Sequence, residues 1–249
     1  MTALLLSLLL AQTGDQPFLH SVALESQLEG PLDWSSVALE VTPRDEHAGE
    51  SAFITRRKTK LKGGVFLVDR LDQLATADAV APRYRKASWV IDFDQPGFTA
   101  AWDAAVAALG KKPTVDAVTA FASGYLTRKS YDRGFDLASY VATHRGGDCT
   151  EHAVFLAALL RRFGIPARAV VGLALIPTAH KPLAFGHMWV EAYVDRRWRV
   201  ADAAIPAELN VARLPAGELV DEGPGYALSL VTQVNTLAFQ RLELKAGSK

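Results

Sequence analysis

The pattern of apolar and polar positions changes character along the chain. Between residues 17 and 73, short β-branched or alternating segments lie between clusters of Gly, Pro and Asp, as in SVALESQLEG, SSVALEV, AFITRRKTKLK and GVFLVDRL. Such segments are typical of β-strands. From residue 99 onward apolar residues recur at helical spacing, first over 99–109, then over 113–128 after a Thr114 cap, and briefly over 136–141. The pattern predicts a β-rich region followed by helices.

The strongest helix signals lie in RGGDCTEHAVFLAALLRRFGIP, residues 145–166. Asp148 is placed to cap the helix, and Glu151 three residues later completes a capping box. Gly164 suits the left-handed position after the last turn, and Pro166 prevents continuation. One face of the helix is apolar throughout and is formed by His152, Phe155, Leu156, Leu159, Leu160 and Phe163. The segment is predicted to be a core helix.

Two strand patterns follow this helix. ARAVVGLALI is apolar on both faces and indicates a buried strand, and GHMWVEAYVDRRWRVADAA indicates a hairpin. If Asp195 and Arg196 form a two-residue turn, the register brings Asp202 beside His187 on one face of the sheet. A three-residue turn would move Asp202 to the opposite face and leave Glu191 as the alternative acid.

Composition narrows the class of protein. In 249 residues, Lys plus Arg and Asp plus Glu are both 27, so no excess charge favours nucleic acid or an anionic membrane. The single cysteine cannot form an internal disulfide. Residues 3–11 form an apolar run that is typical of an export signal and too short to span a bilayer. We expect a protein exported to the periplasm or the extracellular space, with a cytoplasmic location as the alternative and no integral span in the mature chain.

The lone cysteine, Cys149, falls at the first position of the predicted core helix. Free N–H groups there favour a thiolate, whereas the neighbouring acids Asp148 and Glu151 disfavour it. A nucleophilic cysteine in this place therefore needs a cationic partner, and a histidine is the natural one. His187, with Asp202 diagonally beside it, is the candidate, and Trp189 on the same strand face is a candidate substrate contact.

His152 offers a different interpretation of the cysteine. It lies three residues after Cys149 on the apolar face, which favours a core histidine, although the two side chains could also be half of a zinc site. A structural zinc ion requires four N or S ligands, and the sequence holds no second Cys-rich pair. We therefore expect no metal and no cofactor.

Together, GDCTEHA opening a helix that ends in GIPAR, then GHMWVEAYV, then WRVAD, resemble the core of the transglutaminase-like superfamily over residues 146–202. This superfamily is a branch of papain-like thiol enzymes. The resemblance implies an α+β fold with a central Cys149 helix packed on an antiparallel sheet. It also implies that Cys149 is the nucleophile, His187 the base and Asp202 the residue that orients the histidine. The turn between the site strands lacks the usual Gly, and no acidic calcium-binding loop is present.

The activity implied by the resemblance is attack of the thiolate on an amide carbon, giving a thioester that passes to water or to an amine. We expect a protein or peptide substrate, favour hydrolysis over transfer, and place the Cys149 backbone N–H in the oxyanion hole. The alternative is a catalytically silent module that keeps the fold for binding or as a scaffold. The expected organisation is a possible signal peptide at 1–14, a β-rich region at 15–78 and a transglutaminase-like domain at 79–249, in an oligomeric state that the sequence leaves open.

Overall fold

The structure is a computed structural model that describes residues 21–22, 24–28, 32–43, 58–68, 71, 80–130, 135–177, 182–206, 208–219, 223, 225 and 239–247. The predicted export signal lies outside these residues and stays a prediction. Within the described part of the chain, no helix has the length and hydrophobicity needed to cross a bilayer.

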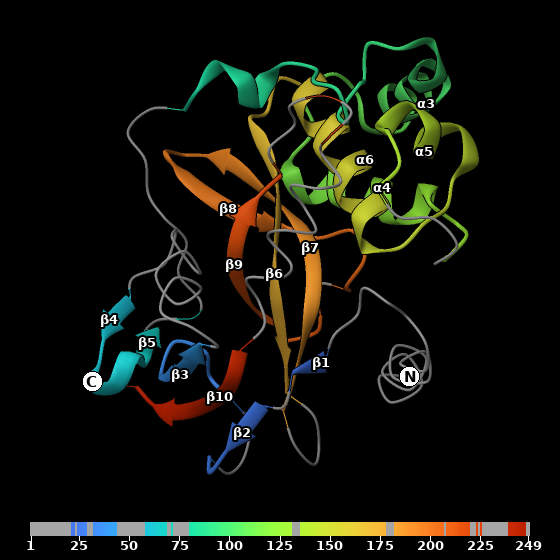
Figure 1. Ribbon diagram of the computed structural model, residues 1–249. Helices are drawn as coiled ribbons and strands as arrows, with labels where there is room; N and C mark the ends of the chain where they lie inside the picture. The colour runs from blue at the N-terminus through green and yellow to red at the C-terminus, as the bar shows by residue number, and fades with distance from the viewer. Residues whose placement is uncertain are drawn as a thin grey trace.

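Two β-sheets and a group of helices make up the described part of the protein (Figure 1). The helices are η1 (Lys62–Gly64), η2 (Pro82–Arg85), η3 (Pro96–Phe98), α3 (Thr99–Leu109), α4 (Val115–Tyr125), α5 (Ala138–His144) and α6 (Cys149–Arg162). The first sheet is antiparallel and holds β1 (Ser21–Val22), β6 (Ala167–Ile176), β7 (Leu183–Val194), β8 (Arg197–Ala201) and β9 (Ala212–Glu218). The second sheet holds β2 (Leu24–Ser26), β3 (Val37–Pro43), β4 (Lys58–Lys60), β5 (Phe66–Val68) and β10 (Phe239–Ala246). The expected α+β fold is confirmed.

Helix α6 is the centre of the helical group. Its residues from Glu151 to Arg161 are all buried, including those outside the predicted apolar face, because α4 and α5 cover the sides that β7 does not. Phe155, Leu156, Leu159 and Leu160 are fully buried and share a core with Met188 and Val190 of β7. Burial of side chains of this size contributes about 1.5–3 kcal/mol each. The core-helix prediction is therefore confirmed.

The long strands β6 and β7 connect two hydrophobic cores. In Figure 1 the helices α3 to α6 lie at one end of these strands and the second sheet lies at the other. Val171 and Met188 belong to the helical core, whereas Leu173 and Ala184, further along the same strands, pack with the second sheet. The two sheets are thus joined by apolar packing and by strands that extend through both regions.

The N-terminal strands do not form a sheet on their own. β10 lies between β2 and β3, parallel to the first and antiparallel to the second, while β1 pairs with β7 of the other sheet. The prediction of β-rich structure in the N-terminal region is confirmed for the described residues. The division into domains at residue 78 stays a prediction. Strands from before this boundary pair with strands from after it in both sheets.

The hairpin between β7 and β8 has the two-residue turn on which the site depends. Val194 pairs with Arg197 and Val190 with Ala201, the predicted register. Asp195 and Arg196 both have positive φ, 53° and 61°, as a type I′ turn requires. This conformation is costly for residues other than Gly, Asn or Asp. Strand twist and pairing along the hairpin stabilise it here.

The turn generates a stability prediction. Replacing Asp195 by Asn and Arg196 by Gly should raise the unfolding free energy by about 0.5–1 kcal/mol, since Asn-Gly adopts positive φ at lower cost. Urea denaturation measures the change. As a control, Arg199→Gly at an exposed strand position of β8 should lower stability, because Gly weakens a strand. A loss of stability in the turn variant would contradict the assignment.

Candidate active site

The start of α6 is held by the predicted capping box. The Thr150 N–H donates to Asp148 Oδ1 at 2.7 Å, and Glu151 folds back to accept from the Asp148 N–H at 2.9 Å. Glu151 also accepts from the Thr150 hydroxyl and from the backbone of Asp136. Because both acids are engaged in this way, they fix the helix start and with it the position of Cys149.

The two glycines before the cap are required by close contacts. A Cβ at Gly146 would lie 2.9 Å from the carbonyl oxygen of Arg128. A Cβ at Gly147, where φ is +148°, would lie 2.3 Å from the Cβ of Glu151. Glycine at both positions therefore makes room for the backbone of Arg128 beside Gly146 and for the folded-back side chain of Glu151 beside Gly147.

Cys149 is a partly exposed residue with a free but buried thiol at the first position of α6. Burial raises the pKa of its thiol well above the ordinary value, and the charge of Asp148 raises it further. The backbone N–H of Met188 donates toward the sulfur and acts in the opposite direction. The helix start alone thus leaves Cys149 protonated, which agrees with the predicted need for a partner.

The Met188 contact places Cys149 at an open stretch of the β7 edge. On the side away from β6, β1 pairs with Ala184 and Phe185, and β8 pairs with β7 from Val190 onward. Within the described part of the chain, residues 186–189 between them have no paired strand on that edge. The hydrogen bond from the Met188 N–H to the Cys149 sulfur brings the start of α6 to these residues.

His187 and Asp202 are hydrogen-bonded, as the two-residue turn predicts. His187 Nε2 lies 2.9 Å from Asp202 Oδ2, and both side chains are buried. The other carboxylate oxygen, Oδ1, accepts from the backbone N–H groups of Ala204 and Ile205 at 3.0 and 3.1 Å. Since Nε2 donates to the carboxylate, Nδ1 is the ring nitrogen left to accept a proton.

Arg213 of β9 completes the polar site and was missed from the sequence. Its Nε and Nη2 lie 2.9 and 2.7 Å from Asp202 Oδ2. Burial raises the pKa of Asp202, but His187 and Arg213 more than offset this and hold it well below its ordinary range. The arginine carries no motif, and only the pairing of β9 with β6 brings it to the site.

Trp189 is buried beside His187. The two rings stack with their centroids 6.2 Å apart, and Trp189 is 1% exposed. Gly172, opposite His187 on β6, makes this possible, since a Cβ there would lie 2.7 Å from the indole Cη2 and 2.0 Å from the Leu214 carbonyl oxygen. A substrate contact at Trp189 stays a prediction. Its observed contact is with the imidazole ring.

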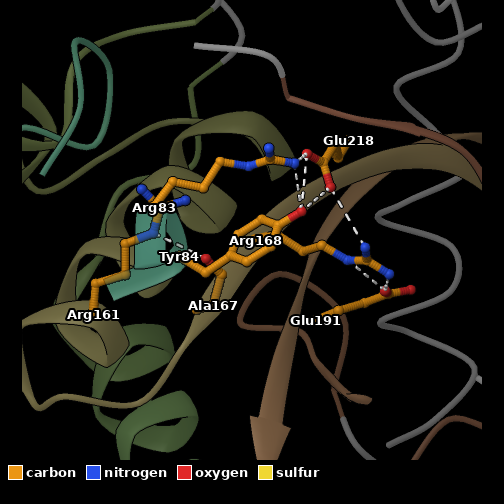
Figure 2. Close-up of polar contacts among 7 residues, drawn as sticks. All are labelled: Arg83, Tyr84, Arg161, Ala167, Arg168, Glu191 and Glu218. Carbon is orange, nitrogen blue, oxygen red and sulfur yellow. Dashed lines mark hydrogen bonds and ion pairs between the residues drawn. The ribbon is translucent and has the colours of Figure 1, made fainter. Parts of the chain in front are cut away.

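Glu191, the alternative acid, is held elsewhere. Its Oε2 accepts from Arg168 Nη2 and Nε at 2.6 and 3.0 Å. Figure 2 shows Arg168 between Glu191 and Glu218, with Tyr84 from η2 donating to Glu218 at 2.8 Å. This network fastens the segment before the helices to the sheet, and it assigns Glu191 to Arg168 and not to His187.

His152 is a buried histidine of the helix, as the core interpretation expects. Its Nδ1 donates to the Asp148 carbonyl oxygen at 2.7 Å, and burial lowers the pKa of the ring. Among the described residues, no group of three or more His, Cys, Asp or Glu side chains is arranged to hold a metal ion.

Comparison with known proteins gives one family match and several similar structures. Residues 100–203 match the model of the transglutaminase-like superfamily. Among solved structures it is similar to a candidate cysteine protease from Cytophaga hutchinsonii (16% identity, 72% of this chain and 76% of that one, TM-score 0.45). It is also similar to the periplasmic domain of TgpA from Pseudomonas aeruginosa bound to ethylmercury (21% identity, 56% and 54%, TM-score 0.40). The curated proteins give no match.

The capping box generates a pH prediction. Burial and the charge of Asp148 raise the pKa of Glu151 from 4.5 to about 7. Between these values the folded protein holds a proton that the unfolded chain has lost, so the unfolding free energy should fall as pH rises. Glu151→Gln should remove as much as about 3 kcal/mol of that fall.

Urea denaturation at about pH 5 and about pH 8 measures the difference between the proteins. The control is Asp116→Asn, which changes an exposed acid in the first turn of α4 and should leave the pH dependence as it is. If the unfolding free energy depends on pH equally in wild type and in Glu151→Gln, Glu151 is ionised throughout this range.

Proposed function

We propose that the protein is a thiol-dependent enzyme that acts on amide bonds through an acyl-enzyme thioester. The observation that carries the proposal is the His187–Asp202 hydrogen bond on the strand whose next residue, Met188, contacts Cys149. Cys149 would be the nucleophile, His187 the base and Asp202 the residue that orients the ring. A protein or peptide amide is the proposed substrate, with hydrolysis favoured over transfer to an amine.

In the proposed reaction His187 Nδ1 takes the proton of the Cys149 thiol, and the resulting thiolate attacks the carbonyl carbon. Because burial and Asp148 raise the pKa of the thiol, the thiolate would form only as a pair with the protonated imidazole. The Cys149 backbone N–H at the helix start would bind the oxyanion. His187 then returns the proton to the leaving amine, and water attacks the thioester, releasing the acid and restoring the thiol.

The alternative function is a catalytically silent binding or scaffold module. The observation in its favour is that burial and neighbouring acids raise the pKa of Cys149, which disfavours a standing thiolate. Alkylation of the thiol by iodoacetamide separates the two. An enzyme should label through a thiolate–imidazolium pair below neutral pH, and a module should label only as an unassisted thiol ionises.

Cys149→Ala is expected to abolish hydrolysis of peptide and glutamine-amide substrates while the protein still unfolds cooperatively, since a single small group is removed from a partly exposed position. His187→Ala should have the same effect. His144→Ala is the matched control, because His144 is an exposed histidine at the end of α5. Hydrolysis that persists in purified Cys149→Ala would refute the proposal.

Asp202→Ala is expected to lower kcat by about a thousandfold or more, with a smaller loss for Asp202→Asn, whose amide oxygen can still orient the ring. Because Asp202 also pairs with the largely buried side chain of Arg213, the alanine variant should lose on the order of 3 kcal/mol of stability. Rates are therefore compared below the unfolding temperature of each variant. A near-native kcat in folded Asp202→Ala would remove Asp202 from the proposed mechanism.

A further inference from the structure

One carboxylate oxygen in the site accepts hydrogen bonds from two side chains. Asp202 Oδ2 accepts from His187 Nε2 at 2.9 Å and from Arg213 Nε and Nη2 at 2.9 and 2.7 Å. The register of the strands explains why His187 and Arg213 reach the same carboxylate. His187 pairs with Gly172 and Arg213 with Ala174, two residues apart on β6, so both side chains leave the sheet on the same face.

The carboxylate has little freedom to turn. The N–H groups of Ala204 and Ile205 hold Oδ1, while Arg213 and His187 hold Oδ2. Arg213 is itself fixed, because its Nη1 donates to the Val211 carbonyl oxygen at 3.1 Å. The arginine side chain is 11% exposed and that of Asp202 5%, so water screens this ion pair only weakly.

We infer that Arg213 is a positioning residue with two effects. It fixes the Asp202 carboxylate toward His187 Nε2, and it reduces the extent to which that carboxylate stabilises the protonated imidazole. The first effect follows from the hydrogen bonds. The second follows from charge, since the arginine neutralises part of the negative charge that stabilises an imidazolium. The inference rests on the proposed function only where it concerns catalysis, because both effects on the His187 ring can be measured without a substrate.

Among the described residues, further titratable groups that interact with this pair lie on α6, and Lys129 acts on one of them, His152. Cys149 and His152 both sense the charge of Asp202, and Asp148 and Glu151 act on Cys149 in turn. Cys149 is removed from the test by substitution with Ala. The remaining groups are the same in each variant, so a difference between variants reports on Arg213.

The test is the titration of His187, followed by NMR of its ring protons in the Cys149→Ala protein. Arg213→Met should raise the His187 pKa by about one pH unit, since an opposing cation is lost. Arg213→Lys should restore most of the original value. In an Asp202→Asn background the substitution of Arg213 should have a much smaller effect, because the shared carboxylate is gone.

Arg168→Met is the matched control. Arg168 is a buried arginine of the same sheet, 12% exposed, and it pairs with Glu191 and not with Asp202. It should leave the His187 pKa unchanged. A His187 pKa that does not move in Arg213→Met, or that moves equally in Arg168→Met, would overturn the inference. Should Arg213→Met fail to fold, Arg213→Gln is judged by the same criterion.

Failure of this inference and failure of the proposed function give different results. A catalytically silent protein would still show the titration shift, because the measurement uses no substrate. If hydrolysis is found, Arg213→Met should lower kcat by about tenfold or more and move the alkaline limb of the rate–pH profile upward, with recovery in Arg213→Lys. Normal hydrolysis with an unmoved His187 pKa would refute only the role of Arg213.

Discussion

Strand β7 pairs with β6 along one edge and divides its other edge between β1 and β8. Among the described residues this division leaves a short unpaired stretch, which includes His187 and Met188. One side of the strand buries Met188 and Val190 against α6, and the other carries His187 and Trp189. The pairing register therefore fixes two things at once, the contact of the sheet with the helix and the side on which the imidazole lies. A slip of one residue would exchange them.

The acidic side chains around Cys149 stabilise the start of the helix and disfavour ionisation of the thiol. Asp148 and Glu151 form a complete capping box, which stabilises the start of α6, yet both raise the pKa of the cysteine that the box positions. Glu151 turns back to the Asp148 N–H and away toward Asp136, while the Met188 N–H, which lowers the thiol pKa, comes from β7. The helix start that positions the thiol and the N–H group that lowers its pKa thus belong to different elements.

Local signals in the sequence were enough to predict α6 and its capping box, because caps and apolar periodicity act over a few residues. For the β7–β8 hairpin they left two turn lengths open, and the structure has the two-residue turn. The same reasoning paired Asp202 with His187. Arg213 could not be found in this way, since the contact depends on how β9 pairs with β6 and no short pattern records that pairing. The burial of Trp189 depends likewise on Gly172 of a neighbouring strand. Short strands such as β1 and β2 gave no signal for which sheet they would join.

The place of β10 between β2 and β3 has a consequence for how the molecule is made. As the chain leaves the ribosome, the helices and β6 to β9 can assemble from neighbouring segments, but β2 and β3 each keep an open edge until residues 239–246 emerge. The second sheet is therefore the last part to close, and its closure joins segments about two hundred residues apart, which slows folding. Until then the growing chain presents unpaired strand edges, which are open to pairing with other chains.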